Sequence, residues 1–298
     1  MTLTAYGDNA QNVLKQAQKR INELDKKLSV SDKNSEVSKL NSAGKGTLSA
    51  DCAFLMEKSL SISRSTNGAF NPMLLPLTKA WGFTDKNYNV PNDKQINALL
   101  KECDISKVRF DKKTGEIEFL QKGMAVDFGG IAKGYASDEV KNIFRSNKVN
   151  GIISLGGNIW AIGSKENGEP WKVAVKNPDS EEKYLGTLSV SDKAIVTSGS
   201  YERYFEKDGK VYHHILDPKT GCPAESHLKS VTIISNDGTL ADGLSTALFV
   251  MGLDKAIEYQ KSHSQQFDAV FYTDDGGIFV TKGIAEQFSS DYKWSIAE

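Results

Sequence analysis

The chain has 298 residues, and its 37 Lys and Arg nearly balance 38 Asp and Glu. With no positive excess, a nucleic-acid or anionic-membrane surface is not expected. Three scattered cysteines are too few for a disulfide framework or a zinc site. No apolar run approaches the ~20 residues that span a bilayer.

Hydrophobic spacing predicts the elements of the first half of the chain. A strand is expected over 2–6, and apolar residues three and four apart predict a helix over 10–28. The polar stretch that follows allows only a short helical turn after Ser35. Further helices are predicted over 51–65 and 93–103, separated by an unusually apolar loop over 69–83, and then come a hairpin of 107–110 with 116–120 and a strand over 124–127.

The second half is mostly sheet. After a helix over 136–146, alternation predicts strands over 151–155, 159–163, 171–175, 184–190 and 194–197, a hairpin around Asp208-Gly209, a strand over 231–235, helices over 240–251 and 253–262, and a last strand pair, 269–272 with 278–281. We therefore expect one mixed α+β domain over 1–298, a domain that can consist of two lobes, with predominantly antiparallel sheet and packed helices.

Three glycines crowd the stretch D-F-G-G-I-A-K-G-Y-A-S-D, 127–138, just before a predicted helix. Backbone without side chains can approach a ligand closely, and amides at a helix start favour an anion. The stretch matches neither standard phosphate motif, so a turn that only joins a strand to a helix explains it equally well.

The stretch S-L-G-G-N-I, 154–159, interrupts two predicted strands with a glycine pair. Asn158 can present an amide at this break. A simple bulge or tight turn accounts for the pattern about as well as ligand contact does.

His213 and His214 stand side by side on a predicted strand, so their side chains point to opposite faces. At most one of them is expected to face a given site. Arg203 and Asp217 flank the pair, which makes one histidine a candidate for proton transfer near neutral pH, although lone histidines are more often structural.

Asp242 and Thr246 are four residues apart at the start of a predicted helix and therefore share a face. A carboxylate and a hydroxyl so placed are hard oxygen ligands, which suit magnesium better than zinc. The alternative is that Asp242 only complements the helix N-terminus and Thr246 lies at the edge of the core. Together, the glycine stretch, the oxygen pair and a candidate base are the parts used in chemistry at the phosphate of an aromatic nucleotide.

Six stretches in order along the chain resemble the ApbE family of flavin transferases (FAD:protein FMN transferase). They are L-S-V-S-D-K-N-S-E-V-S-K-L-N, N-G-A-F-N-P with W-G-F, V-D-F-G-G-I-A-K-G-Y-A-S-D, S-L-G-G-N-I, T-S-G-S-Y-E-R-Y-F with H-H-I-L-D-P-K-T-G, and A-D-G-L-S-T-A-L-F-V-M-G. The resemblance implies a Mg²⁺-dependent enzyme that takes FAD, moves its FMN half onto a Thr hydroxyl of an acceptor protein, and releases AMP.

The resemblance also implies roles for individual residues. The metal would be held by the carbonyl of Gly130 and the side chains of Asp242 and Thr246. FAD would be contacted by Ala69, Phe70, Asn71, Asp127, Lys133 and Ile215, with Phe70 and its neighbours offering an apolar face to a ring. His214 would be the base that deprotonates the acceptor Thr, with His213 as the alternative. The same residues would serve an FAD pyrophosphatase, which gives FMN and AMP, or a flavin-binding module without turnover.

Two departures from the family pattern stand out. Asn71 occupies a position where family members often have Asp. The chain opens Met1-Thr2-Leu3, whereas relatives usually have Met-Gly-Thr before the first strand. Because many relatives are lipoproteins or periplasmic proteins, we expect that a leader or lipid anchor preceded this chain and that it acts outside the cytoplasm. A cytoplasmic location is the alternative.

Overall fold

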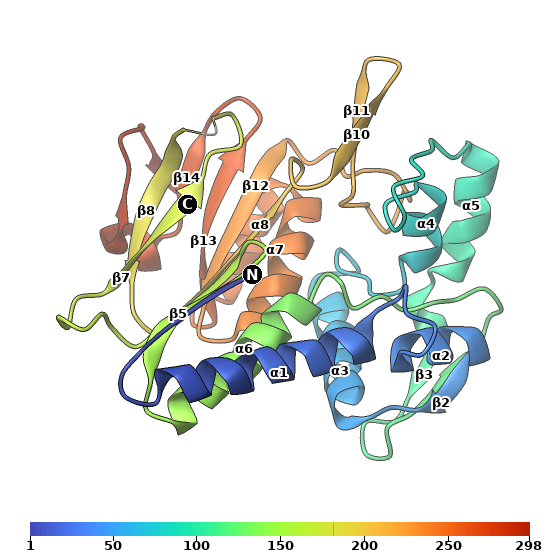
Figure 1. Ribbon diagram of the computed structural model, residues 1–298. Helices are drawn as coiled ribbons and strands as arrows, with labels where there is room; N and C mark the ends of the chain where they lie inside the picture. Colours follow the sequence, from blue (N-terminus) through green and yellow to red (C-terminus); the bar gives the residue numbers. More distant parts are fainter. Residues whose placement is uncertain (181) are drawn as a thin grey trace. The chain divides into compact units, whose positions relative to one another are not determined.

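Strand pairing is almost entirely antiparallel in the computed structural model, which describes residues 1–180 and 182–298 (Figure 1). The chain divides into two compact units, neither of which is continuous in sequence. Unit 1 comprises Met1–Ile21, Lys133–Tyr201 and Glu225–Glu298, and unit 2 comprises Asn22–Ala132 and Glu202–Ala224. The predicted mixed α+β fold with mainly antiparallel sheet is confirmed.

Unit 1 is built on an eight-stranded sheet. In spatial order its strands are β1 (Thr2–Tyr6), β5 (Asn150–Leu155), β6 (Asn158–Ile162), β9 (Lys193–Gly199), β12 (Leu228–Ser235), β13 (Phe267–Thr273), β14 (Ile278–Val280) and β16 (Ser295–Ile296). All neighbours pair antiparallel except β14 with β16. The sheet positions Asn158 at the start of β6 and Ser198 near the end of β9.

A three-stranded sheet packs on one face of the large sheet. It consists of β7 (Trp171–Lys176), β8 (Tyr184–Val190) and β15 (Phe288–Ser289), which follows the 3-10 helix η2 (Lys282–Gln287). Burial alternates along β7, so Trp171, Val173 and Val175 enter the shared core with Ile195, Ile234, Val270 and Val280 of the large sheet. The alternation that predicts β7 and β8 therefore comes from a sheet with one buried side.

Two helices of unit 1 contact the large sheet. α7 (Gly238–Met251) packs on β9 and β12, and α8 (Leu253–Ser262) packs on α7 and β13. In Figure 1 α7 lies beside β12. Because β12 is covered on both faces, Val231, Ile233 and Ile234 are all at most 1% exposed. This explains its continuous apolar run.

Unit 2 combines short helices with two small sheets. Its elements are α2 (Glu36–Ala43), α3 (Ala50–Ser65), α4 (Leu75–Ala80), α5 (Asp93–Glu102), η1 (Ile105–Lys107), the sheet β2 (Lys45–Thr47), β4 (Glu116–Phe119), β3 (Val108–Phe110), and the hairpin β10 (Tyr204–Lys207), β11 (Lys210–His213). An apolar cluster that includes Trp81, Phe83 and Phe205 joins α4 and α5 to the hairpin. The indole N–H of Trp81 donates to the carbonyl of Gly221 at 2.9 Å.

Two helices cross the division between the units in sequence, namely α1 (Ala10–Leu28) and α6 (Ala132–Ser146). The predicted stripe of α1 is confirmed, since Val13 and Ala17 are fully buried and Leu24 is 2% exposed. Among the helices of residues 1–180 and 182–298, none combines the length and the apolar character that crossing a bilayer requires.

Two predicted connections contain helices. The turn expected after Ser35 is a helix, α2, because the Ser35 hydroxyl accepts the N–H of Ser38 and Gly44 ends the helix in the left-handed region. The apolar loop over 69–83 contains α4, in which Pro76 lies in the first turn, where a missing N–H costs nothing.

The strand predicted over 124–127 is wrong. The backbone there is held by a side chain, because Asn41 accepts the N–H of Val126 at 2.7 Å and donates to its carbonyl at 2.9 Å. The N–H of Asp127 donates to the carbonyl of Pro72. The amide of Asn41 thus takes the place of a neighbouring strand, and no ladder forms.

α6 begins at Ala132 and not near Ala136 as predicted. Gly134, expected in a turn, lies inside the helix because α6 and α7 approach each other there. A Cβ on Gly134 would lie 2.2 Å from the carbonyl oxygen of Gly238 and 2.7 Å from Cβ of Asp242. The glycine therefore permits the close approach of two helices.

We expect Gly134→Ala to destabilise the protein by about 1–3 kcal/mol, because the methyl group overlaps backbone atoms that have no room to move. Thermal or urea unfolding measures this loss. Gly46→Ala is the control, because a Cβ on Gly46 meets nothing within 4 Å. A Gly134→Ala protein as stable as this control would contradict the close packing of α6 on α7.

Candidate functional site

Asp242 lies in the second turn of α7 and is 3% exposed. Its Oδ2 accepts a hydrogen bond from the N–H of Gly134 at 2.8 Å, which fixes the carboxylate against the first turn of α6. No hydrogen bond to Oδ1 is found among the described residues. Because a carboxylate is a hard oxygen ligand, this side chain is suited to meeting a cation such as magnesium.

Thr246 follows Asp242 by one turn of α7 and is partly exposed. Its Oγ1 lies 3.3 Å from Oγ of Ser198 on β9, and that oxygen lies 2.8 Å from Oγ of Ser245. Asp242 and these three hydroxyls are all hard oxygen donors. The donor chemistry therefore fits magnesium.

The described residues contain no group of three His, Cys, Asp or Glu side chains placed to hold a metal. A metal at Asp242 would depend on hydroxyl and carbonyl oxygens as well. Gly130, the predicted carbonyl ligand, lies in a turn of unit 2, whereas Asp242 and Thr246 belong to unit 1. Its role stays a prediction.

Lys133 lies in the first turn of α6, and its side chain is exposed. Its Nζ donates to Oδ1 of Asn158 at 3.3 Å and to the carbonyl of Gly156 at 3.5 Å. Gly156 and Gly157, with φ of 55° and 92°, form the two-residue turn between β5 and β6. The tight turn indicated by S-L-G-G-N-I is therefore present, and it contacts a residue predicted to bind FAD.

Ala69, Phe70 and Asn71 follow the end of α3 in unit 2. Ala69 and Phe70 are 8% and 3% exposed, so the Phe70 ring is packed inside the protein and does not offer an open apolar face. The amide of Asn71 donates to the carbonyl of Cys103 at 2.9 Å and accepts the N–H of Met73 at 2.8 Å. A carboxylate at position 71 could not donate to Cys103, which gives the departure from Asp a structural reason.

Asp127 accepts the N–H of Gly129 at Oδ1, 2.8 Å away, and so closes the turn that precedes α6. Burial raises the pKa of the Asp127 carboxyl above its usual range, opposed by the Gly129 hydrogen bond and by the charges of Arg203 and Lys79. A ligand that donates hydrogen bonds to this carboxylate would stabilise its charged form. The contact with FAD stays a prediction.

His214 follows the last residue of β11, so only His213 of the pair lies on the predicted strand. Nδ1 of His214 lies 3.1 Å from the carbonyl oxygen of Arg203. Because a carbonyl oxygen only accepts, Nδ1 carries the proton and Nε2 carries the lone pair. The ring also meets Phe83 edge to face, with centroids 6.3 Å apart. The histidine is therefore held in a tautomer suited to accepting a proton at Nε2.

His213 has the opposite tautomer. Its Nε2 lies 3.2 Å from the carbonyl oxygen of Ala224, so the lone pair is on Nδ1, which is buried. Desolvation lowers the pKa of His213, opposed by the hydrogen bond to Ala224. Nearby Ile215 is 4% exposed, and its carbonyl accepts the N–H of Ala224. Of the two histidines, His214 has the better geometry for a base.

The predicted site residues divide between the two units. Lys133, Asp242 and Thr246 belong to unit 1, and the others belong to unit 2. Sequence reasoning did not find Ser198 and Ser245 beside Thr246, nor the contact of Asn158 with Lys133. The hydroxyls occur inside quoted motifs, but the packing of α7 on β9 decides which of them meet.

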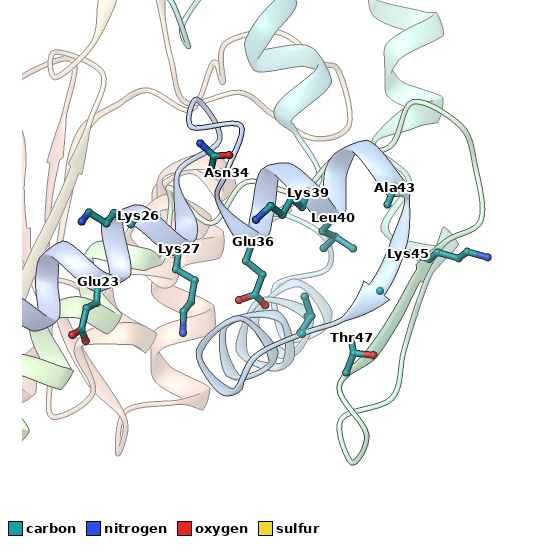
Figure 2. A pocket seen from close by; sticks show the side chains of 12 residues that line it. Glu23, Lys26, Lys27, Asn34, Glu36, Lys39, Leu40, Ala43, Lys45 and Thr47 are labelled. Carbon is teal, nitrogen blue, oxygen red and sulfur yellow. The ribbon is translucent and has the colours of Figure 1, made fainter.

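A surface pocket of about 570 Å³ lies elsewhere, between the end of α1, α2 and β2 (Figure 2). Its lining includes Lys26, Lys39 and Lys45 and none of the predicted site residues. In Figure 2 the side chain of Lys45 points away from those of Lys26 and Lys39. Lys27, also in the lining, is paired with Asp51 at 2.5 Å. The lining mixes basic side chains with Glu23 and Glu36, and none of the residues predicted to bind FAD or a metal contributes to it.

Proteins with solved structures share the fold. The chain matches the ApbE protein of Thermotoga maritima with a TM-score of 0.89 and 33% identity, covering 96% of this chain and 94% of that one. It matches the flavin transferase ApbE of Vibrio cholerae with a TM-score of 0.83 and 26% identity, covering 94% and 91%. The shared fold thus places the chain among the ApbE-like α+β proteins.

Sequence comparison gives the family. The chain is 35% identical to the FAD:protein FMN transferase of Klebsiella pneumoniae over 82% of this chain and 75% of that protein. It is 34% identical to the protein of the same name from Treponema pallidum, over 78% and 68%. The model of the ApbE family matches residues 1–271. The chain belongs to the ApbE family, which confirms the resemblance found in its motifs.

Proposed function

We propose that the protein is an FAD:protein FMN transferase that requires Mg²⁺, attaches FMN to a Thr hydroxyl of an acceptor protein, and releases AMP. Relatives at 30–35% identity carry the name of this activity. The observation that carries the proposal is the arrangement around Asp242. Its carboxylate is buried and accepts a hydrogen bond from the N–H of Gly134, the residue after Lys133. Asp242 also lies on the same helix as Thr246. A lysine that is predicted to face an anion and a set of oxygens that suit a metal therefore belong to the same unit.

The proposed chemistry is an exchange of phosphate esters. The Thr oxygen of the acceptor forms a bond to the phosphorus of the FMN half, the bond from that phosphorus to the bridging oxygen breaks, and AMP leaves. His214 would take the Thr proton at Nε2, because its other ring nitrogen already donates to Arg203. Lys133 would meet the negative charge of the pyrophosphate.

Asp242, Thr246 and the carbonyl of Gly130 would hold Mg²⁺. When bound, the metal would supply positive charge that offsets the charge of the pyrophosphate. In unit 2, Ala69, Phe70, Asn71, Asp127 and Ile215 would contact FAD. Since Phe70, Asn71 and Ile215 have buried or engaged side chains, their contacts would come mainly from backbone atoms.

The test is incubation with FAD, MgCl₂ and an acceptor that carries a D/S-G-A-T-like segment, followed by in-gel flavin fluorescence, protein mass and AMP release. Transfer predicts a fluorescent acceptor with its Thr modified and one AMP for each flavin attached. FMN and AMP without labelled acceptor would instead establish an FAD pyrophosphatase. FAD binding without AMP under any condition would leave a flavin-binding module.

We also propose that the protein acts outside the cytoplasm and that its precursor is anchored to the membrane through an N-terminal leader. This proposal rests on the resemblance of the sequence motifs to the ApbE family. Cell fractionation of the full-length precursor tests this location, and recovery only in the cytoplasmic fraction would contradict it.

A further inference from the structure

Asn158 is a buried amide that the fold itself does not require. It is the first residue of β6, its side chain is 0% exposed, and its backbone is paired in the ladders with β5 and β9. Its Nδ2 has no hydrogen-bond partner among the described residues. An unpartnered buried amide nitrogen lowers stability, so an apolar side chain of the same size would serve the fold at least as well.

The other end of this amide has one specific contact. Oδ1 accepts from Nζ of Lys133 at 3.3 Å, and the carbonyl of Gly156 accepts from the same ammonium at 3.5 Å. The assignment of Oδ1 to this side is fixed by chemistry, because an ammonium group only donates. Both distances are long for hydrogen bonds, so the two oxygens orient the ammonium without fixing its position.

The geometry of this contact suits a lysine that must face an anion. An ammonium has three donors, and two of those of Lys133 are directed at protein oxygens. One donor remains, and the exposed side chain keeps it near solvent. Without the two oxygens, a lysine on the first turn of a helix would sample many rotamers, and ordering it on binding would cost entropy.

We propose that Asn158 is a positioning residue that pre-orders the Lys133 ammonium for the pyrophosphate of FAD. It acts through Lys133 and makes no contact with the reacting atoms. The inference rests on the proposed function, because it takes FAD to be the ligand of Lys133. Retention of an amide that lowers stability is expected where the amide serves binding.

The test compares Asn158→Leu, Lys133→Met and the double variant in FAD titrations with MgCl₂, followed by flavin fluorescence, together with the melting temperature of each free protein. We expect Asn158→Leu to keep or raise the melting temperature and to weaken FAD binding about tenfold. In the Lys133→Met background the same substitution is expected to change the dissociation constant of FAD by less than about twofold.

Gln260→Leu is the matched control, because Gln260 is a buried amide of unit 1 whose Nε2 donates to the carbonyl of Phe267 at 2.9 Å. It is expected to lower the melting temperature and to leave FAD binding unchanged. Asn158→Ala provides a second variant if the leucine does not fit, with the same weakening of FAD binding expected.

Two results would overturn the inference. One is wild-type affinity for FAD in both Asn158 variants while Lys133→Met weakens binding. The other is an equal loss from Asn158→Leu with and without Lys133, which would show that Asn158 acts independently. Failure of the proposed function has a different signature, since wild-type protein would then bind no FAD, or Lys133→Met would bind it as tightly as wild type.

Discussion

The Asp242→Asn enzyme is expected to transfer FMN on the order of 10³-fold more slowly than wild type at saturating FAD. A metal ion contributes several kcal/mol to charge stabilisation in such reactions, and each 1.36 kcal/mol is a factor of ten in rate. The variant should still fold, because the Asn oxygen can accept the N–H of Gly134 as Oδ2 of Asp242 does. Only the negative charge of the buried carboxylate is removed.

Initial rates of AMP release over a MgCl₂ titration measure this effect, and calorimetric titration with MgCl₂ measures metal binding directly. Asp237→Asn makes the same chemical change on the same helix. Asp237 caps α7 by accepting the N–H of Leu240 at 2.8 Å, which an Asn side chain does equally well. Asp237→Asn should therefore retain full turnover. Full Mg²⁺-dependent turnover in Asp242→Asn would show that the metal assignment is wrong.

The second large effect is expected for His214→Ala, which should label the acceptor about 10²–10⁴-fold more slowly. The reason is the loss of Nε2, the ring nitrogen that carries the lone pair when Nδ1 donates to Arg203. FAD affinity should change little, because the substitution removes a proton acceptor and not a predicted cofactor contact. Fluorescent labelling of the acceptor at fixed FAD measures the rate.

His227→Ala serves as the control, since the side chain of His227 is 84% exposed and pairs with Asp274 on the surface. His213→Ala separates the two candidates, because the lone pair of His213 is on buried Nδ1. If His214→Ala labels the acceptor at the native rate, His214 is not the base. A large loss in His213→Ala alone would transfer the role to that residue.

Hydrophobic periodicity and turn residues correctly predict the elements that depend on local sequence patterns. α8 has the predicted bounds, 253–262, and the hairpin around Asp208-Gly209 pairs as expected. Both follow from local patterns, an amphipathic stripe and a turn with positive φ at Asp208 and Gly209.

The secondary-structure predictions were wrong where the backbone contacts a residue that is distant in sequence. The segment 124–127 is extended and apolar enough to predict a strand, but its partner is the amide of Asn41. The start of α6 was misplaced because Gly134 indicates a turn by composition. Its actual role is the close approach to Gly238, which no local pattern reveals.

For the candidate site, sequence reasoning found the residue types but not the hydrogen bonds that their side chains form. The helical spacing of Asp242 and Thr246 is predictable, whereas the bond from Gly134 to Asp242 depends on how two helices pack. Likewise, adjacency in sequence could not separate His213 from His214. Carbonyl oxygens of Arg203 and Ala224 set the two tautomers, and these come from other parts of unit 2.

The interleaving of the two units has a consequence for synthesis on the ribosome. All of unit 2 has been made once Ala224 is added, whereas unit 1 still lacks β12, β13 and β14 from the middle and far edge of its large sheet. β1, although made first, pairs with β5, with Thr2 opposite Ser154. Such long-range pairing is slow. Unit 2 can therefore become structured before β1 pairs with β5.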